Sequence, residues 1–170
     1  MQTALADATA PTLQRALESD AGVRWMPAAN FHLTLVFLGS VPRSRLPAVE
    51  EAAASCVQSS ASPSVEVVLD GIEYWRRSQL LCVTASATPP AVTRLAASLS
   101  QALTARSFTP DLKEGLRAHV TIARKIRRPI QIPQIKPQAW LFRSFALVES
   151  KTKPEGSAYT VIASYPLSPG

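Results

Sequence analysis

A four-residue pattern of histidine, an apolar residue, threonine and a second apolar residue occurs twice in this chain, at residues 32–35 and 119–122. The two copies contain both histidines of the 170-residue sequence. Each copy lies in an apolar run typical of a β-strand, where successive side chains point to opposite faces. His32 and Thr34 therefore share one strand face, and His119 and Thr121 share another. The repeat predicts two similar structural halves, each presenting an imidazole beside a hydroxyl.

Each copy taken alone also has a purely structural interpretation. A histidine in a strand is commonly half-buried with its ring nitrogens bonded to the backbone, and threonine is a favoured strand residue. The recurrence of the whole pattern favours a shared functional role instead.

The composition is that of a folded protein with an excess of positive charge. Apolar residues make up 46% of the chain, which is enough to build a core. The 18 lysines and arginines outnumber the 12 acidic residues, giving a net charge of +6 that is compatible with a polyanionic partner. Basic residues gather around the second pattern, so an anion near His119 would meet positive charge: Arg117, Arg124, Lys125, Arg127 and Arg128.

The two cysteines, Cys56 and Cys82, both fall in apolar patterns. They are interpreted as small buried residues, without a disulfide framework or metal cluster, in a reducing compartment. The chain does not open with a secretory signal pattern, and no apolar run approaches the roughly 18 residues of a membrane helix. We therefore expect a cytoplasmic protein with no membrane association.

Strand and helix patterns follow one another along the chain. Strands are predicted at residues 2–6, 30–38, 65–72, 80–85, 118–123, 142–149 and 159–165. Helices are predicted at residues 11–19, over the apolar run from Leu46 to Cys56, and from Pro90 to Arg106, while residues 73–79, 108–114 and 129–137 are predicted to be connections. Each half holds one patterned strand and one long helix. This order predicts an α+β protein with two similar lobes and a cleft between them, within one domain of residues 1–170.

Two imidazoles facing each other suit a reaction in which one group removes a proton and the other donates one. Histidine can do both near neutral pH because its ordinary pKa is about 6.5. In-line displacement at phosphorus makes this demand, since the entering and leaving oxygens lie on opposite sides. The hydroxyls of Thr34 and Thr121 can donate to the non-bridging oxygens. Neither pattern offers the carboxylates of a catalytic metal site, so we expect no metal and no cofactor.

Residues 30–39 and 117–124 resemble the two signature motifs of the 2H phosphoesterases, and in particular of the bacterial RNA 2′,3′-cyclic phosphodiesterases of the LigT/ThpR type. Residues 75–83 and 150–167 are similar to further segments of that family. The resemblance implies a bilobal, pseudo-two-fold α+β fold. Each lobe would contain an antiparallel β-sheet with helices on its outer face and one motif, and the active-site cleft would lie between the lobes.

The resemblance also implies roles for individual residues. His32 would donate a proton to the leaving ribose oxygen, and His119 would accept a proton from the attacking water. Thr34, Thr121 and Arg124 would contact the phosphate, since a planar guanidinium suits that anion. For Arg124 the alternative is a solvated charge at a strand end. The expected activity is metal-independent hydrolysis of the 2′,3′-cyclic phosphodiester end of an RNA or nucleotide to a 2′-phosphate, by a monomer.

Two other hypotheses remain for the function. A phosphoesterase or reversible ligase could act on 2′-5′ linkages or small cyclic nucleotides with the same motifs. A basic RNA-binding module could retain the fold without turnover. Trp75 is either a platform for stacking a base or a core or rim residue.

Overall fold

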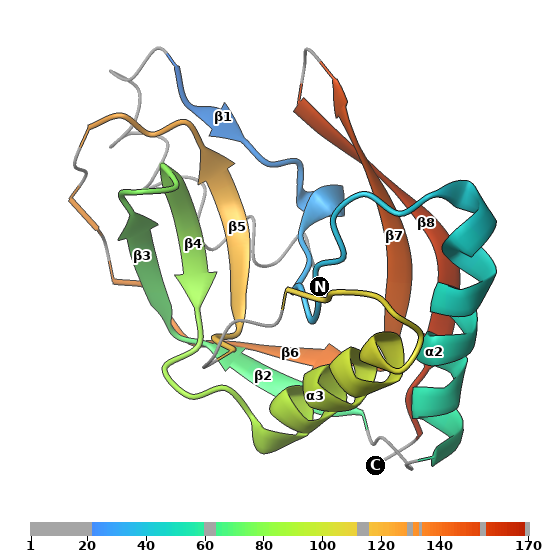
Figure 1. Cartoon of the computed structure of the whole chain (residues 1–170). Helices are drawn as coiled ribbons and strands as arrows, with labels where there is room; N and C mark the ends of the chain where they lie inside the picture. Colours follow the sequence, from blue (N-terminus) through green and yellow to red (C-terminus); the bar gives the residue numbers. More distant parts are fainter. Residues whose placement is uncertain are drawn as a thin grey trace. The chain divides into compact units, whose positions relative to one another are not determined.

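The computed structural model describes residues 22–59, 64–111, 116–128, 131–132, 134–153 and 156–168, which form two compact units (Figure 1). Unit 1 comprises Met1–Thr34, Val67–Ala87 and Arg117–Trp140, and unit 2 comprises Leu35–Glu66, Thr88–Leu116 and Leu141–Gly170. The elements in chain order are β1 (Arg24–Trp25), η1 (Ala28–Asn30), η2 (Arg43–Arg45), α2 (Leu46–Ser59), β2 (Val65–Leu69), β3 (Gly71–Trp75), β4 (Leu80–Thr84), α3 (Pro90–Thr104), β5 (His119–Arg124), β6 (Gln138–Phe142), β7 (Ser144–Lys153) and β8 (Gly156–Pro166).

Unit 1 is built on a four-stranded antiparallel sheet with the strand order β1-β5-β4-β3. Strands β3, β4 and β5 lie side by side in Figure 1. Leu81, Val83 and Val120 on the two central strands are completely buried, and burial of such branched side chains is the main force that stabilises the sheet. The hydroxyl of Tyr74 on β3 donates to the carbonyl of Ile126 at 2.8 Å, which ties the segment after β5 to the sheet.

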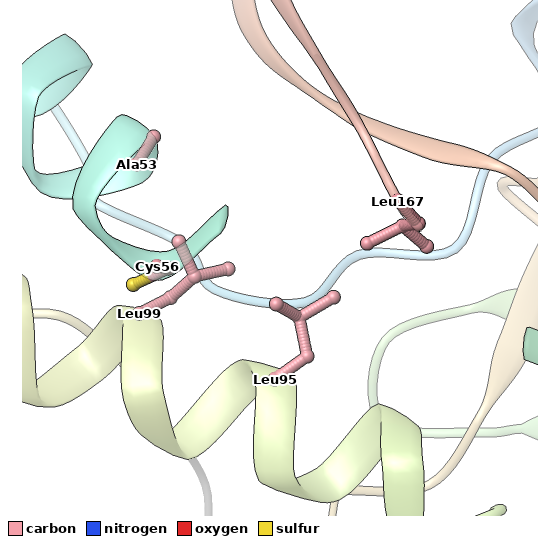
Figure 2. Close-up of a cluster of buried hydrophobic side chains, with 5 residues drawn as sticks. All are labelled: Ala53, Cys56, Leu95, Leu99 and Leu167. Carbon is pink, nitrogen blue, oxygen red and sulfur yellow. The ribbon is translucent and has the colours of Figure 1, made fainter. Parts of the chain in front are cut away.

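Unit 2 contains the two long helices and the β7–β8 hairpin. Helix α3 begins at Pro90, where the missing N–H of proline costs nothing, and it buries the predicted stripe of Val92, Leu95, Ala96, Leu99 and Leu103. Two of these leucines pack against Ala53 and Cys56 of α2 and against Leu167 (Figure 2). A second cluster joins Val49 and Ala52 to Leu103. The packing of α2 on α3 therefore follows from their apolar stripes.

The hairpin is longer than the sequence indicates. Strands β7 and β8 pair over their whole length, from Ser144 opposite Pro166 to Lys153 opposite Gly156, with one register shift after Leu147. Strand β6 begins directly after the predicted connection at residues 129–137 and pairs with β2 in a two-stranded sheet. The boundary between the units falls within both β2 and β6.

The predicted α+β class with antiparallel sheets in two lobes is confirmed. The prediction of one strand at residues 65–72 is wrong, because at Asp70 the chain passes from the two-stranded sheet of β2 and β6 to the four-stranded sheet. The Asp70 carboxylate accepts hydrogen bonds from the backbone N–H and the hydroxyl of Ser86, at 2.8 and 2.6 Å. Asp70 thus separates β2 from β3, and β3 continues to Trp75 through residues predicted to be a connection.

Residues 30–38, which contain the first motif, also do not form the regular strand that was predicted. They form only isolated bridges, Leu33 with Val120 and Phe37 with Asp111. The 3₁₀ turn η1, entered at Pro27, ends at Asn30, the first of these residues. Within the described residues, both α2 and α3 belong to unit 2, so the expected division of one long helix per half does not hold. The predicted elements at residues 2–6 and 11–19 lie outside the described residues.

Candidate active site

The two repeated motifs lie side by side in unit 1. Leu33 forms an antiparallel bridge with Val120, the residue between His119 and Thr121. Antiparallel pairing at this point places His32 across from Thr121 and Thr34 across from His119. All four side chains point away from the face occupied by Leu33 and Val120, because side chains alternate along each segment.

This arrangement differs from the expectation of one motif per lobe, since all four motif side chains belong to unit 1. The reason is the path of the chain before the first motif. Strand β1 pairs with the last residues of β5, Arg24 with Arg124 and Trp25 with Ala123, along the edge of β5 that β4 leaves open. After η1 the chain returns to the same edge at Leu33. The first motif thus continues β1 along β5.

The pairing also sets the spacing of the site. Residues directly opposite each other in an antiparallel pair have Cβ atoms about 5 Å apart, and diagonal neighbours such as His32 and His119 are roughly 7–8 Å apart. A phosphate group can lie between two imidazoles at that spacing. His32 and Thr34 are exposed, whereas His119 and Thr121 are half-buried.

Both imidazoles are held by the same kind of hydrogen bond. Nδ1 of His32 lies 2.7 Å from the carbonyl oxygen of Asn30, and Nδ1 of His119 lies 2.8 Å from the carbonyl oxygen of Arg117. A carbonyl can only accept, so each Nδ1 donates its hydrogen. The Nε2 atom of each ring is then the one that accepts a proton in the neutral state and donates it in the charged state.

Arg124 reaches the histidine side of the sheet through a β-bulge. Strict alternation from His119 places Arg124 on the opposite face, with Val120 and Ile122. The register between β4 and β5 shifts, however, so that Cys82 pairs with Thr121 while Leu80 pairs with Arg124, which leaves Ile122 as the extra residue. Leu80 and Cys82 share a face of β4, and paired residues project on the same side. Arg124 therefore projects with Thr121.

Cys82 lies next to Thr121 on this face, which we call the histidine face of the sheet. Its Sγ is 3.7 Å from Oγ1 of Thr121, and the residue is completely buried. Burial raises the pKa of the Cys82 thiol to about 11, although the hydrogen bond from Thr121 and the charge of Arg124 act in the opposite direction. The thiol is therefore neutral at physiological pH and acts as a packed neighbour of the motif hydroxyl.

Glu73, which was not predicted from the sequence, links Trp75 and Arg117 beside His119. The ring of Trp75 lies with its centroid 4.5 Å from that of His119, at an interplanar angle of 57°. The Trp75 indole N–H donates to Glu73 Oε2 at 3.0 Å, and both Glu73 oxygens accept hydrogen bonds from the guanidinium of Arg117. The i, i+2 spacing of Glu73 and Trp75 would have revealed a shared strand face, had β3 been predicted to extend so far.

Among the residues that the structure describes, no three His, Cys, Asp or Glu side chains are grouped as a metal site would need. Within the same residues, no helix is long and apolar enough to cross a membrane.

The family model described as LigT like Phosphoesterase matches residues 6–80, which include the first motif but not the second. No curated protein sequence matches the chain.

Solved structures resemble the chain over most of its length. The structure of Escherichia coli LigT complexed with 3′-AMP has a TM-score of 0.82 at 22% identity, covering 96% of this chain and 91% of that one. The protein TT0787 of Thermus thermophilus has a TM-score of 0.79 at 24% identity, with coverages of 99% and 92%. E. coli LigT complexed with phosphate is 27% identical, with a TM-score of 0.70 and coverages of 88% and 82%. The family match covers less than half of the chain, and the solved structures show that the chain shares the fold of LigT.

Proposed function

We propose that the protein hydrolyses 2′,3′-cyclic phosphodiester ends of RNA to 2′-phosphates, with His32 and His119 as proton donor and acceptor and without a metal ion. The observation that supports the proposal is the bridge between Leu33 and Val120, which joins the two segments that carry the imidazoles. Both rings have Nδ1 occupied by a backbone carbonyl, so both can exchange protons through Nε2. Such a pair supplies an acid and a base to one phosphorus centre.

In the proposed reaction a water molecule attacks the phosphorus and loses its proton to Nε2 of His119. The bond between phosphorus and the ribose 3′ oxygen breaks, and Nε2 of protonated His32 delivers its proton to that oxygen. The product carries a 2′-phosphate and a 3′-hydroxyl. Solvent then moves a proton from His119 to His32, which restores the starting state. All four motif side chains come from one chain, so we propose that the monomer is active.

Positive charge next to the motifs supports an anionic substrate. Arg24 pairs directly with Arg124 across β1 and β5, so both guanidinium groups project on the same side of the sheet. Like charges directly opposite each other destabilise a sheet, and an anion bound between them relieves the repulsion. Thr34 and Thr121 would donate their hydroxyls to the non-bridging oxygens. The E. coli LigT structures complexed with 3′-AMP and with phosphate are consistent with a nucleotide phosphate as the ligand here.

The proposal is tested by incubating the protein with a nucleoside 2′,3′-cyclic phosphate in EDTA and separating the 2′- and 3′-phosphate products by chromatography. We expect turnover to the 2′ isomer alone. His32→Ala and His119→Ala should each lower kcat by about 10²- to 10⁴-fold, because each removes a group that transfers a proton. Thr160→Val, an exposed change on β8, serves as the control that should keep full activity.

Three results would contradict the proposal. Turnover that is lost in EDTA and restored by a divalent ion would mean that a metal takes part. Wild-type kcat in either histidine variant would remove that histidine from the mechanism. RNA binding without any turnover of the cyclic phosphate would instead favour the non-catalytic alternative.

A further inference from the structure

Glu73 connects the two groups that hold His119. One of them is the carbonyl of Arg117, which accepts the Nδ1 hydrogen at 2.8 Å. The other is the indole ring of Trp75, whose centroid lies 4.5 Å from the imidazole centroid. Glu73 accepts hydrogen bonds from both residues, from the Arg117 guanidinium and from the Trp75 indole N–H.

The strand register explains why these groups meet. Glu73 and Trp75 are two residues apart on β3 and therefore lie on the same face. Glu73 pairs with Cys82, and Cys82 pairs with Thr121, so Glu73 lies in the same cross-strand row as the motif threonine. Arg117 lies two residues before the start of β5 at His119. Its guanidinium reaches across β4 to Glu73.

We propose that Glu73 is a positioning residue that fixes the orientation and the tautomer of His119 through Arg117 and Trp75. The bidentate contact with Arg117 is directional, because two parallel hydrogen bonds define the plane of the guanidinium. It holds the chain at the entry to β5, where the Arg117 carbonyl must face Nδ1. The hydrogen bond to the indole N–H holds the Trp75 ring against the imidazole, and tilted aromatic contacts of this kind restrict ring rotation.

Each part of this group has a distinct effect on the imidazole. The Arg117 carbonyl selects the tautomer with hydrogen on Nδ1, since only that form can donate to it. The Trp75 ring limits the directions in which Nε2 can point. Without Glu73 both restraints weaken together, and the neutral imidazole can also populate the tautomer with hydrogen on Nε2, which cannot accept a proton at that atom. The inference about catalysis depends on the proposed function, but the inference about the tautomer does not.

Long-range ¹H–¹⁵N NMR spectra of the imidazoles test the proposal directly, because the chain has only two histidines. The His32→Ala variant assigns the two rings. At about pH 8, where ordinary imidazoles are neutral, we expect both rings of the wild-type protein in the form with hydrogen on Nδ1. In Glu73→Ala the His119 signals should move towards a mixture of tautomers. The His32 signals should stay unchanged, because that ring donates to Asn30 on a different segment.

Two further variants separate the restraints and guard against a failure of Glu73→Ala to fold. Glu73→Gln keeps an acceptor for the indole but loses the charge opposite Arg117, and it should give an intermediate change in the His119 signals. Trp75→Phe keeps an aromatic ring beside His119 but removes the N–H bonded to Glu73. The tautomer of His119 should be retained in this variant, because Glu73 still holds Arg117. Glu149→Ala, which removes the carboxylate paired with Lys151 on β7, is the matched control and should change neither ring.

Kinetics give a second readout. With a nucleoside 2′,3′-cyclic phosphate, Glu73→Ala should lower kcat about tenfold or more and change KM by less than about twofold, because the base is misdirected while the phosphate contacts remain. His119 signals identical to those of the wild type in folded Glu73→Ala or Glu73→Gln would overturn the proposal, and so would equal shifts of both rings. If the wild-type protein proves inactive but His119 alone responds to Glu73, the proposed function fails and the positioning role stands.

Discussion

Replacing the motif threonines by valine separates a role in phosphate binding from a role in strand formation. Valine has nearly the shape of threonine and at least its preference for strands, so Thr34→Val and Thr121→Val remove little more than a hydroxyl. If each hydroxyl donates to a charged phosphoryl oxygen in the transition state, its loss costs about 1.5 to 3 kcal/mol. That corresponds to a decrease in kcat/KM of roughly 10- to 150-fold.

The structure predicts that the two threonines are not equivalent. Thr121 is half-buried and Thr34 is exposed, so the hydroxyl of Thr121 acts in a medium of lower dielectric constant. Thr121→Val should therefore lie near the upper end of that range and Thr34→Val near the lower end. Stability should change by less than about 1 kcal/mol, since the Thr121 contact with Cys82 Sγ is a 3.7 Å interaction with a weakly bonding sulfur.

The assay is initial-rate kinetics with a nucleoside 2′,3′-cyclic phosphate, together with urea unfolding of each variant. Thr160→Val supplies the same chemical change at an exposed position of β8, and its kcat/KM should equal that of the wild type. If both motif variants retain wild-type kcat/KM, the threonines are only good strand residues. The phosphate would then have to be bound by arginine and backbone groups alone.

Measurements at three other positions test separate parts of the structure. Arg124→Lys should have a kcat/KM between those of wild type and Arg124→Ala, because lysine keeps the charge but loses the planar pair of donors. Leu99→Ala should lower the free energy of unfolding by about 2 to 5 kcal/mol in a urea titration, since it opens a cavity between α2 and α3. Cys82 should resist iodoacetamide at about pH 8 in the folded protein, because its pKa is raised from 9.0 to about 11. The raised pKa favours the folded state below pH 9, so this contribution to stability should be lost between pH 9 and about 11, and a Cys82→Ala variant should lose less stability over that interval.

The sequence by itself determined the features that depend on local pattern. The stripe of apolar residues after Pro90 predicts the buried face of α3, because helical periodicity needs no knowledge of the partner. The duplicated motif likewise predicts that each histidine shares a face with its threonine, since alternation is a property of any extended chain. The α+β class with two lobes also followed from the order of these patterns, whereas the antiparallel sheets were implied by the family resemblance.

The tertiary structure alone decided how the candidate site is assembled. The pairing of Leu33 with Val120 joins segments far apart in the sequence, and no local pattern specifies the register of such a contact. The bulge at Ile122 turns Arg124 to the histidine face, against the alternation that the sequence predicts, because a bulge is defined by the hydrogen bonds of the neighbouring strand. Glu73 reaches Arg117 and Trp75 for the same reason: cross-strand neighbours are set by register, which is fixed only when the whole sheet forms.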